Sequence, residues 1–443
     1  MTDIHPMPVD VLLTGGTLVT MDGQRRILTD AALAVQGERI AWLGSAAEAA
    51  ARFIPAKTID LAGKVVTPGL INTHGHWAMT LFRGLVDDRA LEGWLNVIWK
   101  VEGAFASPQN VAAGSRLAMI EMLRGGTTCA ADMYWQFRHT TEAARQAGFR
   151  IVNGPSFTEI KGFQGQKSTE YASAIEYLER YRGDPLVCLC IQTHSTYTTN
   201  LAMMEDARRL SEERGLLFIT HASESRAEVE TVRAKYGGKT PIEVLDQAGL
   251  LGPRTLLAHC VHLSDAEIER LAQSGTAVAH CPSSNLKLGN GFARVADMLR
   301  AGVTVAIGTD GPASNNDLDL LGEAQLAAMI QKGVTADPAA LPAGQVFAML
   351  TCDGARALGL GERLGSLEPG KLADIAVLDF DSPNLTPTYD LYSHLIYAAA
   401  SADVSDVLVN GQVLMEGRRL LTLDEPAVKA EVRRIAREVR LVE

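Results

Sequence analysis

The sequence lacks any long apolar run, and this absence excludes a protein anchored by a transmembrane helix. No stretch approaches the roughly 20 apolar residues that such a helix needs. The first ten residues also lack the basic region and the apolar core of a secretory signal peptide. We therefore expect a cytoplasmic protein with no membrane partner.

The sequence also has no cluster of basic residues. Its 41 Lys and Arg are outnumbered by 52 Asp and Glu, which gives a net charge of −11. Proteins that bind a nucleic-acid backbone need a concentrated positive surface. The composition thus disfavours a nucleic-acid polymer as partner and favours a small-molecule substrate.

Cysteine is sparse and lacks the spacing of a metal or disulfide motif. None of the six cysteines belongs to a CxxC pair, and most stand within apolar runs, so we interpret them as reduced core residues. They are Cys129, Cys188, Cys190, Cys260, Cys281 and Cys352.

The middle of the chain alternates short apolar strands with amphipathic helices. This alternation runs from residue 65 to residue 364 and is typical of parallel α/β folds. Eight strands are expected, which predicts a (β/α)8 barrel of the TIM type. The predicted strands are Val65–Ile71, Thr127–Ala131, Arg150–Asn153, Leu186–Gln192, Leu216–Thr220, Thr255–Ala258, Ala277–Ala279 and Thr304–Gly308.

The two ends of the chain follow a different pattern of short β-rich runs and tight turns. Examples are Val11–Thr20 near the start and Val404–Val409 near the end. The 443 residues also exceed the roughly 250 that a barrel needs. We therefore predict a small β-sandwich domain formed by residues 1–64 and 365–443, with the barrel inserted between them.

Polar side chains stand at the ends of several predicted strands, where a barrel of this type builds its site. The first strand leads into His74-Gly75-His76, whose alternation in extended backbone puts both imidazoles on the same side. Later strand ends carry His194, His221, His259 and Asp310.

Three of these histidines and the aspartate form a candidate metal site. One histidine after a strand is more often a hydrogen-bonded structural residue, but here the number of candidates favours ligands. Three imidazoles and one carboxylate suit zinc, and a bound water would become a nucleophile. The predicted ligands of one zinc ion are His74, His76, His221 and Asp310.

Glu224 and His259 are the candidate catalytic side chains beside that site. Glu224 lies three residues after His221, near the start of a helix, where it can carry protons without binding the metal. The alternative is a solvated glutamate that only favours the helix dipole. His259 stands at a strand end, so we prefer it to His262 for orienting the water.

Several segments together resemble the amidohydrolase superfamily, and the resemblance runs nearly end to end. They are Pro68–His76, the HxxE segment His221–Glu224, His259–Leu263, Gly308–Gly311 and Gly365–Asp374. Within that superfamily the sequence is most similar to the 5′-methylthioadenosine/S-adenosylhomocysteine deaminases. This likeness rests on Met79–Leu85, on Trp94-Leu95 followed by Glu102, on Ser284–Leu288 and on Asp310–Asp319.

The resemblance implies a hydrolytic deaminase with one divalent metal ion, Zn2+, that replaces the adenine amino group by oxygen and releases ammonia. It implies that Glu102 accepts hydrogen bonds from ribose hydroxyls and that His194 helps to bind the substrate. His259 and Asp310 would activate water, and Glu224 would carry protons to the ring and the leaving amine. The family also leads us to expect a homo-oligomer.

A single metal ion is favoured over a pair. Binuclear relatives carry a bridging carboxylated lysine at a strand end, whereas the corresponding strand here ends in Gln192-Thr193-His194. The HxE and PCxxC segments of the cytidine-deaminase zinc site are absent from this chain.

Some positions depart from the pattern of the deaminases. Trp77, which we include among the substrate-binding residues, stands where small residues are common, and Lys100 stands in place of a proline. Residues 192–197 read QTHSTY, and Asn153–Lys167 lacks the arginine that relatives use on the outer part of the substrate. These departures keep open an aminohydrolase or chlorohydrolase of another heterocycle, such as an s-triazine or a guanine-like base. A non-catalytic scaffold is disfavoured, since every proposed ligand is present.

Overall fold

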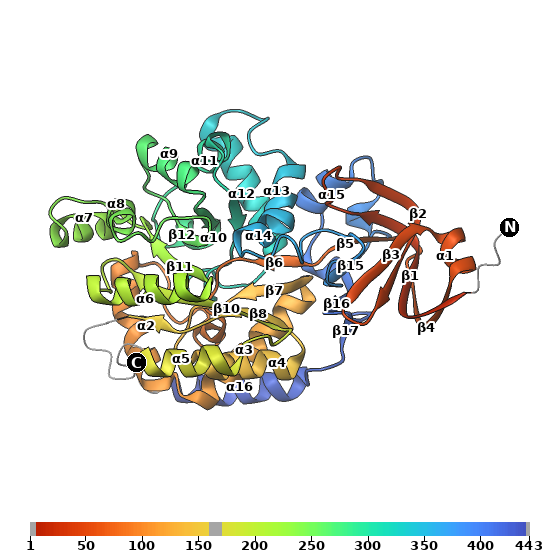
Figure 1. The fold of residues 1–443 in the computed structure, drawn as a ribbon, viewed down its shortest axis with the longest axis horizontal. Coiled ribbons are helices and arrows are strands. Elements are labelled where there is room, and N and C mark those ends of the chain that lie inside the picture. The colour runs from red at the N-terminus through yellow and green to blue at the C-terminus, as the bar shows by residue number, and fades with distance from the viewer. Residues whose placement is uncertain (1–5, 159–170, 440–443) are drawn as a thin grey trace.

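The computed structural model describes residues 6–158 and 171–439. Within these residues, eight parallel strands follow one another in chain order around a nearly closed barrel (Figure 1). The backbone N–H of Thr73 donates to Ile307 O at 3.1 Å and so links the first strand to the last. The predicted fold class is confirmed. The barrel strands are β6 (Leu70–Asn72), β7 (Thr127–Ala131), β8 (Arg150–Asn153), β10 (Val187–Ser195), β11 (Leu217–Ala222), β12 (Thr255–His259), β13 (Ala277–His280) and β14 (Val305–Ile307), with β9 (Ser156–Phe157) paired beside β10.

Helices surround the barrel and begin where the sequence carries capping residues. Ser107 caps α3 (Pro108–Arg124) by accepting a hydrogen bond from the Asn110 N–H, and Pro108 occupies the first turn. No helix of the described residues is both long and apolar enough to cross a membrane. η1 (Trp77–Phe82) and α2 (Leu91–Phe105) follow the first barrel strand, and the helices after α3 are α4 (Phe137–Ala147), α5 (Tyr171–Arg180), α6 (Leu201–Arg214), α7 (Arg226–Lys235), α8 (Pro241–Gln247), α9 (Asp265–Ser274), α10 (Pro282–Lys287), α11 (Val295–Ala301), α12 (Leu320–Thr335), α13 (Ala343–Leu350) and α14 (Cys352–Ala357).

The chain ends form one mixed sheet, which has nine strands in the described part of the molecule. Its order is β18-β17-β16-β15-β5-β1-β2-β3, and β4 pairs with β1. Apolar side chains from both ends of the chain, among them Leu13, Val66 and Ile375, pack into a common core. The predicted small β domain made of both termini is confirmed, and its boundaries at residues 64 and 365 stay a prediction. The elements are β1 (Met7–Val19), β2 (Ile27–Gln36), β3 (Arg39–Ser45), α1 (Ala46–Arg52), β4 (Phe53–Asp60), β5 (Lys64–Pro68), β15 (Ile375–Asp379), α15 (Leu391–Tyr397), β16 (Val404–Val409), β17 (Gln412–Glu416) and β18 (Arg419–Leu420).

The first predicted barrel strand is divided between the two sheets. β5 pairs with β1 and β15 in the sheet of the chain ends, and only β6 belongs to the barrel. Between them, Gly69 passes so close to Thr128 that a Cβ atom there would lie 2.1 Å from the Thr128 hydroxyl oxygen. The prediction of one continuous strand over Val65–Ile71 is therefore wrong, because Pro68 offers no N–H to continue the ladder and the chain changes sheets at Gly69.

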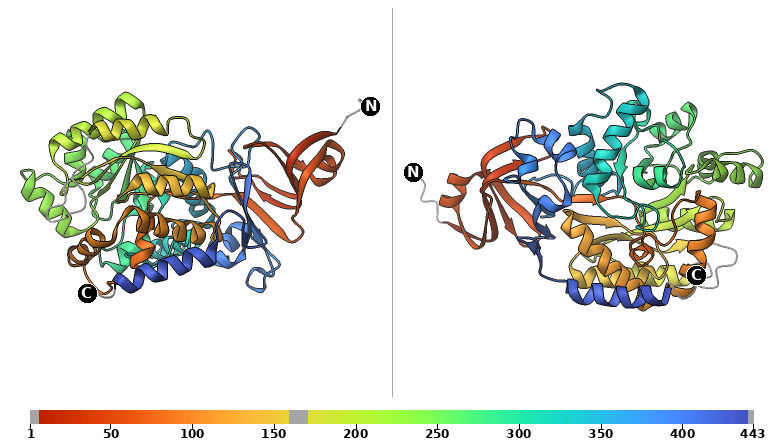
Figure 2. Two further views of the ribbon diagram at one scale, coloured as in Figure 1. Left: turned by 90° about the horizontal axis from the view of Figure 1, so that it is seen from below. Right: turned by 180° about the vertical axis from the view of Figure 1, so that it is seen from behind.

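The last helix leaves the small sheet and returns to the barrel (Figure 2). α16 (Glu425–Val439) packs against α3, and its Glu425 lies 2.6 Å from the Arg124 guanidinium. Val428 and Val432 belong to the same apolar cluster as residues of η1 (Trp77–Phe82) and α2 (Leu91–Phe105). The C-terminal segment thus supports the two elements that follow the first barrel strand.

A buried ion pair joins the barrel to the small sheet. Arg150, in β8, is fully buried, and its Nε and Nη2 atoms donate to the two carboxylate oxygens of Asp374 at 2.8 and 2.9 Å. Nη2 also donates to Asn410 Oδ1 at 2.9 Å, and the Asn410 N–H donates to Asp374 at 2.7 Å. Each charge is therefore compensated only while its partner is present.

Replacing Arg150 by Met is expected to destabilise the protein by about 3–5 kcal/mol, because the carboxylate of Asp374 would stay buried without its cation. Thermal and urea unfolding followed by circular dichroism would show lower midpoints. The matched control is Arg182→Met, which breaks the exposed pair with Glu179 and should leave both midpoints nearly unchanged. Equal effects of the two substitutions would contradict a structural role for the buried pair.

Candidate functional site

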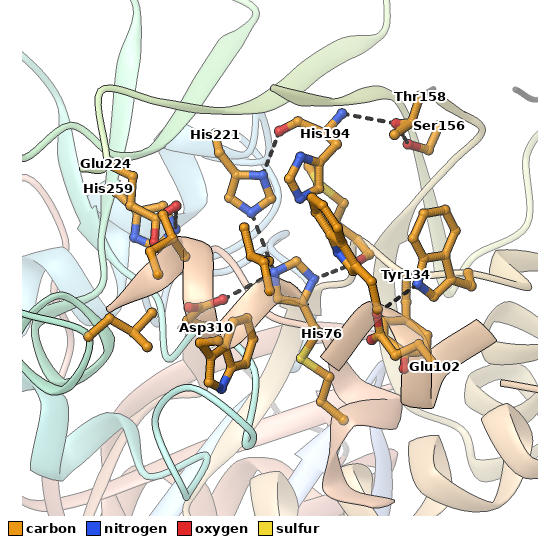
Figure 3. A pocket seen from close by; sticks show the side chains of 18 of the residues that line it. His76, Glu102, Tyr134, Ser156, Thr158, His194, His221, Glu224, His259 and Asp310 are labelled. Carbon is orange, nitrogen blue, oxygen red and sulfur yellow. Dashed lines mark hydrogen bonds and ion pairs between the residues drawn. The ribbon is translucent and has the colours of Figure 1, made fainter. Parts of the chain in front are cut away.

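A cavity lies at the carboxyl ends of the barrel strands, where side chains from distant segments converge (Figure 3). The histidines and carboxylates of its lining are all residues that the sequence singles out: His76, Glu102, His194, His221, Glu224, His259 and Asp310. Much of the remaining lining is apolar or aromatic and comes from α2 and the segment after β7: Leu91, Trp94, Leu95, Trp99, Met133, Tyr134, Trp135 and Phe137. The cavity joins a group of ionisable side chains to an apolar wall.

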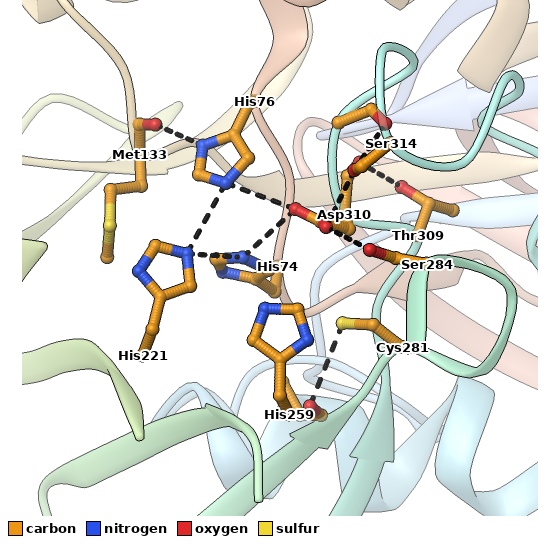
Figure 4. A network of polar contacts seen from close by, with 12 residues as sticks. His74, His76, Met133, His221, His259, Cys281, Ser284, Thr309, Asp310 and Ser314 are labelled. Atoms are coloured by element: carbon orange, nitrogen blue, oxygen red, sulfur yellow. Dashed lines mark hydrogen bonds and ion pairs between the residues drawn. The ribbon is translucent and has the colours of Figure 1, made fainter. Parts of the chain in front are cut away.

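The four predicted metal ligands form a compact cluster at this cavity (Figure 4). His221 Nε2 lies 3.1 Å from His74 Nε2 and 3.4 Å from His76 Nε2. Asp310 Oδ1 lies 3.5 Å from His74 Nε2 and 3.1 Å from His76 Nε2. A tetrahedral zinc site with ligands at about 2.0–2.1 Å separates its ligand atoms by about 3.3–3.4 Å. The spacing of the four atoms therefore fits one metal ion.

The hydrogen bonds behind the imidazoles leave their Nε2 lone pairs facing the centre of the cluster. His76 Nδ1 contacts the carbonyl oxygen of Met133, and His221 Nδ1 donates to His194 O at 2.5 Å. A carbonyl can only accept, so Nδ1 carries a proton, and in the neutral imidazole Nε2 is then left unprotonated. This tautomer is the one that binds a metal through Nε2.

Asp310 turns one carboxylate oxygen toward the histidines and holds the other in hydrogen bonds. Ser284 and Ser314 donate their hydroxyls to Oδ2 at 2.6 and 2.7 Å. Oδ1 is buried and makes no hydrogen bond within residues 6–158 and 171–439. The φ of +60° at Asp310 is rare for a residue other than glycine. A buried, unpaired oxygen on a strained residue fits a ligand for a cation.

Glu224 follows β11 and lines the cavity beside His259. Its Oε1 accepts a hydrogen bond from Asn290 Nδ2 at 3.1 Å, and its Oε2 lies 3.6 Å from His259 Nε2. Burial raises the pKa of Glu224 to about 8, so the side chain can give and take a proton near neutral pH. An exposed fraction of 7% does not agree with the alternative of a solvated glutamate.

His259 ends β12 and faces the same cluster. Its Nδ1 contacts Asn285 Oδ1 at 2.9 Å, and one of its ring nitrogens lies within 4.8 Å of ligand atoms of His74 and Asp310. Its φ of +72° is again rare for a residue other than glycine. His262, by contrast, is not among the residues that line the cavity.

Glu102 lies on α2, on the face that also buries Trp94 and Leu95. Trp135 Nε1 donates to its Oε2 at 3.1 Å, while Oε1 is buried and unpaired in the described part of the chain. Burial raises the pKa of Glu102 to about 7. The free oxygen is therefore available to a ligand hydroxyl at the wall of the cavity.

His194 lines the cavity and also orients a candidate ligand. Its ring centroid lies 4.8 Å from that of His221 and 5.8 Å from that of Trp99. Its Nδ1 contacts the Thr198 hydroxyl at 2.9 Å, and its backbone oxygen accepts the hydrogen bond from His221. The sequence predicts the first of these two placements and gives no signal for the second.

Trp77, Lys100 and Gln192 are absent from the cavity lining, although the sequence places all three near the substrate. Trp77 is fully buried, its Nε1 donates to Ala131 O at 3.0 Å, and its ring packs against Phe149. Lys100 is exposed on α2. The predicted substrate contact of Trp77 is wrong, because its side chain packs into the apolar core.

The segment without the expected arginine is described only in part, since residues 159–167 of Asn153–Lys167 lie outside the described residues. In the described part, Ser156 and Thr158 line the cavity, and their hydroxyls lie 3.0 Å apart. The Thr158 hydroxyl also accepts a hydrogen bond from the His194 N–H at 3.1 Å.

Several residues of the site escape sequence reasoning. Asn290 holds Glu224, and no local signal pairs the two. Asn285 holds His259 and lies in Ser284–Leu288, a segment that carries the resemblance, but the resemblance does not assign it this contact. The apolar wall does carry a signal, because its residues on α2 recur at helical spacing: Leu91, Trp94, Leu95, Trp99 and Glu102.

Comparisons with known proteins agree with this geometry. A 5-methylthioadenosine/S-adenosylhomocysteine deaminase from Syntrophobacter fumaroxidans is 42% identical over 439 residues, which cover 97% of this chain and 98% of that protein. An adenosine deaminase structure from Xanthomonas campestris with bound zinc superimposes with a TM-score of 0.96 at 38% identity, covering 99% of this chain and 100% of that one. An atrazine chlorohydrolase structure from Arthrobacter aurescens TC1, complexed with zinc, has a TM-score of 0.87 at 28% identity, covering 96% of this chain and 100% of that one.

The sequence-based resemblance is confirmed over most of the chain. The model of the amidohydrolase family matches residues 65–414, which include the barrel strands, the four clustered ligand residues and strands β15 and β16 of the small sheet. With that match, and with the full-length likeness to the deaminases, the chain belongs to the amidohydrolase family.

Proposed function

We propose that this protein is a zinc-dependent aminohydrolase that converts adenosine-type nucleosides to their inosine analogues and ammonia. The candidate substrates are 5′-methylthioadenosine, S-adenosylhomocysteine and adenosine. One observation carries the proposal: a single cavity is lined by three of the four clustered ligand residues, by the buried Glu224 beside them, and by Glu102, whose Oε1 makes no hydrogen bond within the described residues. The full-length likeness to nucleoside deaminases supports the same substrate class.

The proposed metal ligands are His74, His76, His221 and Asp310, whose ligand atoms are spaced for one ion. A divalent ion held there would lower the pKa of a bound water and so supply a nucleophile at neutral pH. His259 and the carboxylate of Asp310 face that position and would accept hydrogen bonds from the attacking water. The rest of the chemistry is proton transfer by the protein.

Glu224 is proposed to carry the protons of the reaction. It takes a proton from the attacking water and delivers one to the ring nitrogen next to the reacting carbon. The water oxygen bonds to that carbon, and its second proton passes through Glu224 to the exocyclic nitrogen. The bond between this nitrogen and the carbon then breaks, so that ammonia leaves and the ring keeps a carbonyl oxygen. A carboxyl group with a pKa near neutrality suits both directions of transfer.

The wall of α2 is proposed to hold the nucleoside. The unpaired Oε1 of Glu102 would accept hydrogen bonds from ribose hydroxyls, and the aromatic lining offers flat apolar surfaces for a purine ring. His194 lines the cavity next to His221 and would complete the substrate contacts.

The expected homo-oligomeric state and cytoplasmic location stay predictions that rest on the sequence.

A hydrolase of another heterocycle is the second candidate. The similarity to the atrazine chlorohydrolase structure supports it, since the same barrel in that protein accommodates a triazine. An s-triazine or a guanine-like base would use the same metal cluster and Glu224 but would leave Glu102 without a ribose partner. The two candidates therefore differ in their dependence on Glu102.

An ammonia-release assay over adenosine, its 5′-thio derivatives, guanine-type bases and aminotriazines tests the proposed reaction. Turnover is expected for the nucleosides, and Glu224→Gln should lower kcat by about 10²–10⁴-fold, because it removes the proton carrier. Glu230→Gln, on the exposed face of α7, the helix that begins just after Glu224, is the matched control and should leave kcat unchanged. Ammonia from triazines alone would overturn the nucleoside assignment.

We expect the protein to hold one zinc ion per chain after purification in metal-containing buffer. Atomic emission would measure this zinc content. His221→Ala should lower the bound metal well below one equivalent, because it removes one of the imidazole nitrogens that would bind the ion. Exposed His139 provides the control, since His139→Ala should keep the metal. Retention of zinc by the His221 variant would contradict the proposed ligand set.

Glu102→Gln should raise KM for a nucleoside by about 10- to 100-fold, since hydrogen bonds to a charged group contribute about 1.5–3 kcal/mol. The same substitution should hardly change KM for adenine or an aminotriazine, which lack ribose. Steady-state kinetics on both kinds of substrate separate these outcomes. An unchanged KM for the nucleoside would show that Glu102 does not bind ribose.

A further inference from the structure

Three helices between β11 and β13 begin with the same short pattern, a Ser or Thr at the N-cap and a Glu three residues later. The pairs are Ser225 and Glu228 in α7, Thr240 and Glu243 in α8, and Ser264 and Glu267 in α9. In α8 and α9 the glutamate returns to the N–H of its own cap residue, at 2.8 and 2.7 Å. These two are ordinary capping boxes.

The glutamate of α7 makes a different set of contacts. Glu228 is 4% exposed, and its carboxylate reaches past the cap residue to two backbone N–H groups. Its Oε1 accepts from Ser223 N at 3.2 Å, and its Oε2 accepts from Glu224 N at 2.6 Å. The carboxylate therefore holds the peptide segment that carries the proposed proton carrier.

That segment needs a restraint because its backbone is strained. Ser223 has a φ of +54°, in the left-handed region that disfavours a residue with a side chain. Its carbonyl oxygen accepts hydrogen bonds from Val261 N at 3.0 Å and His262 N at 2.9 Å. The same segment is thus tied on one side to Glu228 and on the other to the loop that follows His259.

The N-cap residue links this segment to the wall of the cavity as well. The Ser225 hydroxyl accepts a hydrogen bond from the Glu228 N–H at 2.9 Å and donates to Glu92 Oε1 at 2.9 Å. Glu92 stands in the first turn of α2, the helix that carries Glu102. The start of α7 is therefore also held from the side of α2.

We propose that Glu228 is a positioning residue for the reaction: its carboxylate clamps the N–H groups of Ser223 and Glu224 and keeps the Glu224 side chain beside the metal-ligand cluster. The inference rests on the proposed function, in which Glu224 carries protons. Glu228 itself is not among the residues that line the cavity, so it acts only through Glu224.

Glu228→Gln tests the clamp with little change in side-chain volume. The new amide can accept from one N–H group, but its NH2 group faces the other and cannot accept from it. We expect kcat to fall about 10- to 100-fold, as a misplacement of about 1 Å at a catalytic group can cause. KM and zinc content should stay at the wild-type values, and amide hydrogen exchange should become faster at residues 223 and 224.

Glu267→Gln is the matched control, because it removes the equivalent carboxylate from the capping box of α9, where the glutamate bonds to its own cap residue Ser264. It should leave kcat and the exchange at residues 223 and 224 unchanged. Glu228→Asp, whose shorter side chain reaches only one of the two N–H groups, should fall between the wild type and Glu228→Gln.

A double variant tests whether Glu228 works through Glu224. Glu224→Gln combined with Glu228→Gln should be no slower than Glu224→Gln alone, because the clamp has nothing left to position. Additive losses would overturn the inference. So would wild-type turnover and wild-type exchange in both Glu228 variants, or equal losses in Glu228→Gln and Glu267→Gln.

The exchange measurement separates this inference from the proposed function. A wild-type protein that releases no ammonia from any nucleoside refutes the proposed substrate. Faster exchange at residues 223 and 224 in Glu228→Gln, with no change in Glu267→Gln, would still support the clamp in that case. Unchanged exchange would refute the clamp whatever the substrate is.

Discussion

Three imidazole nitrogens and one carboxylate oxygen converge to within 3.1–3.5 Å of their neighbours, and the rest of the site depends on this convergence. Lone pairs packed so closely in a buried place repel one another unless a cation lies between them. The barrel brings them together because its parallel strands all end at the same face. His74 and His76 follow β6, while Asp310 follows β14, so the two ends of the strand order meet at the cluster.

The backbone around this cluster is shaped to aim side chains at the cost of local strain. Ser223, His259 and Asp310 stand at three strand ends, and each has a φ between +54° and +72°. Such conformations cost on the order of 1–3 kcal/mol each. Hydrogen bonds between neighbouring loops offset part of this cost, for example from Asp310 N to His74 O at 3.0 Å. Hydrogen bonds between neighbouring loops thus connect the strained residues of the site.

Sequence reasoning succeeds where local pattern and fold class are enough to place a residue. The strand-end histidines and Asp310 were predictable because a parallel barrel gathers whatever follows its strands. Sequence reasoning fails at Trp77, because only the packing of its ring against Phe149 shows that the side chain lies in the core. It also fails at Val65–Ile71, because periodicity does not reveal that the chain changes sheets at Gly69.

The sequence by itself determined the barrel, the small domain split between the chain ends, and the residue types of the metal cluster, because these follow from periodicity, spacing and ligand chemistry. Only the tertiary structure decided which groups hold the catalytic side chains in place. Asn290 reaches Glu224 across 66 positions, and Ser284 reaches Asp310 across 26. Glu228 lies close in sequence to the groups that it holds, yet its departure from the ordinary capping box depends on the strained turn at Ser223. Local sequence predicts which face of an element is polar, but the folded chain determines which partner that face meets.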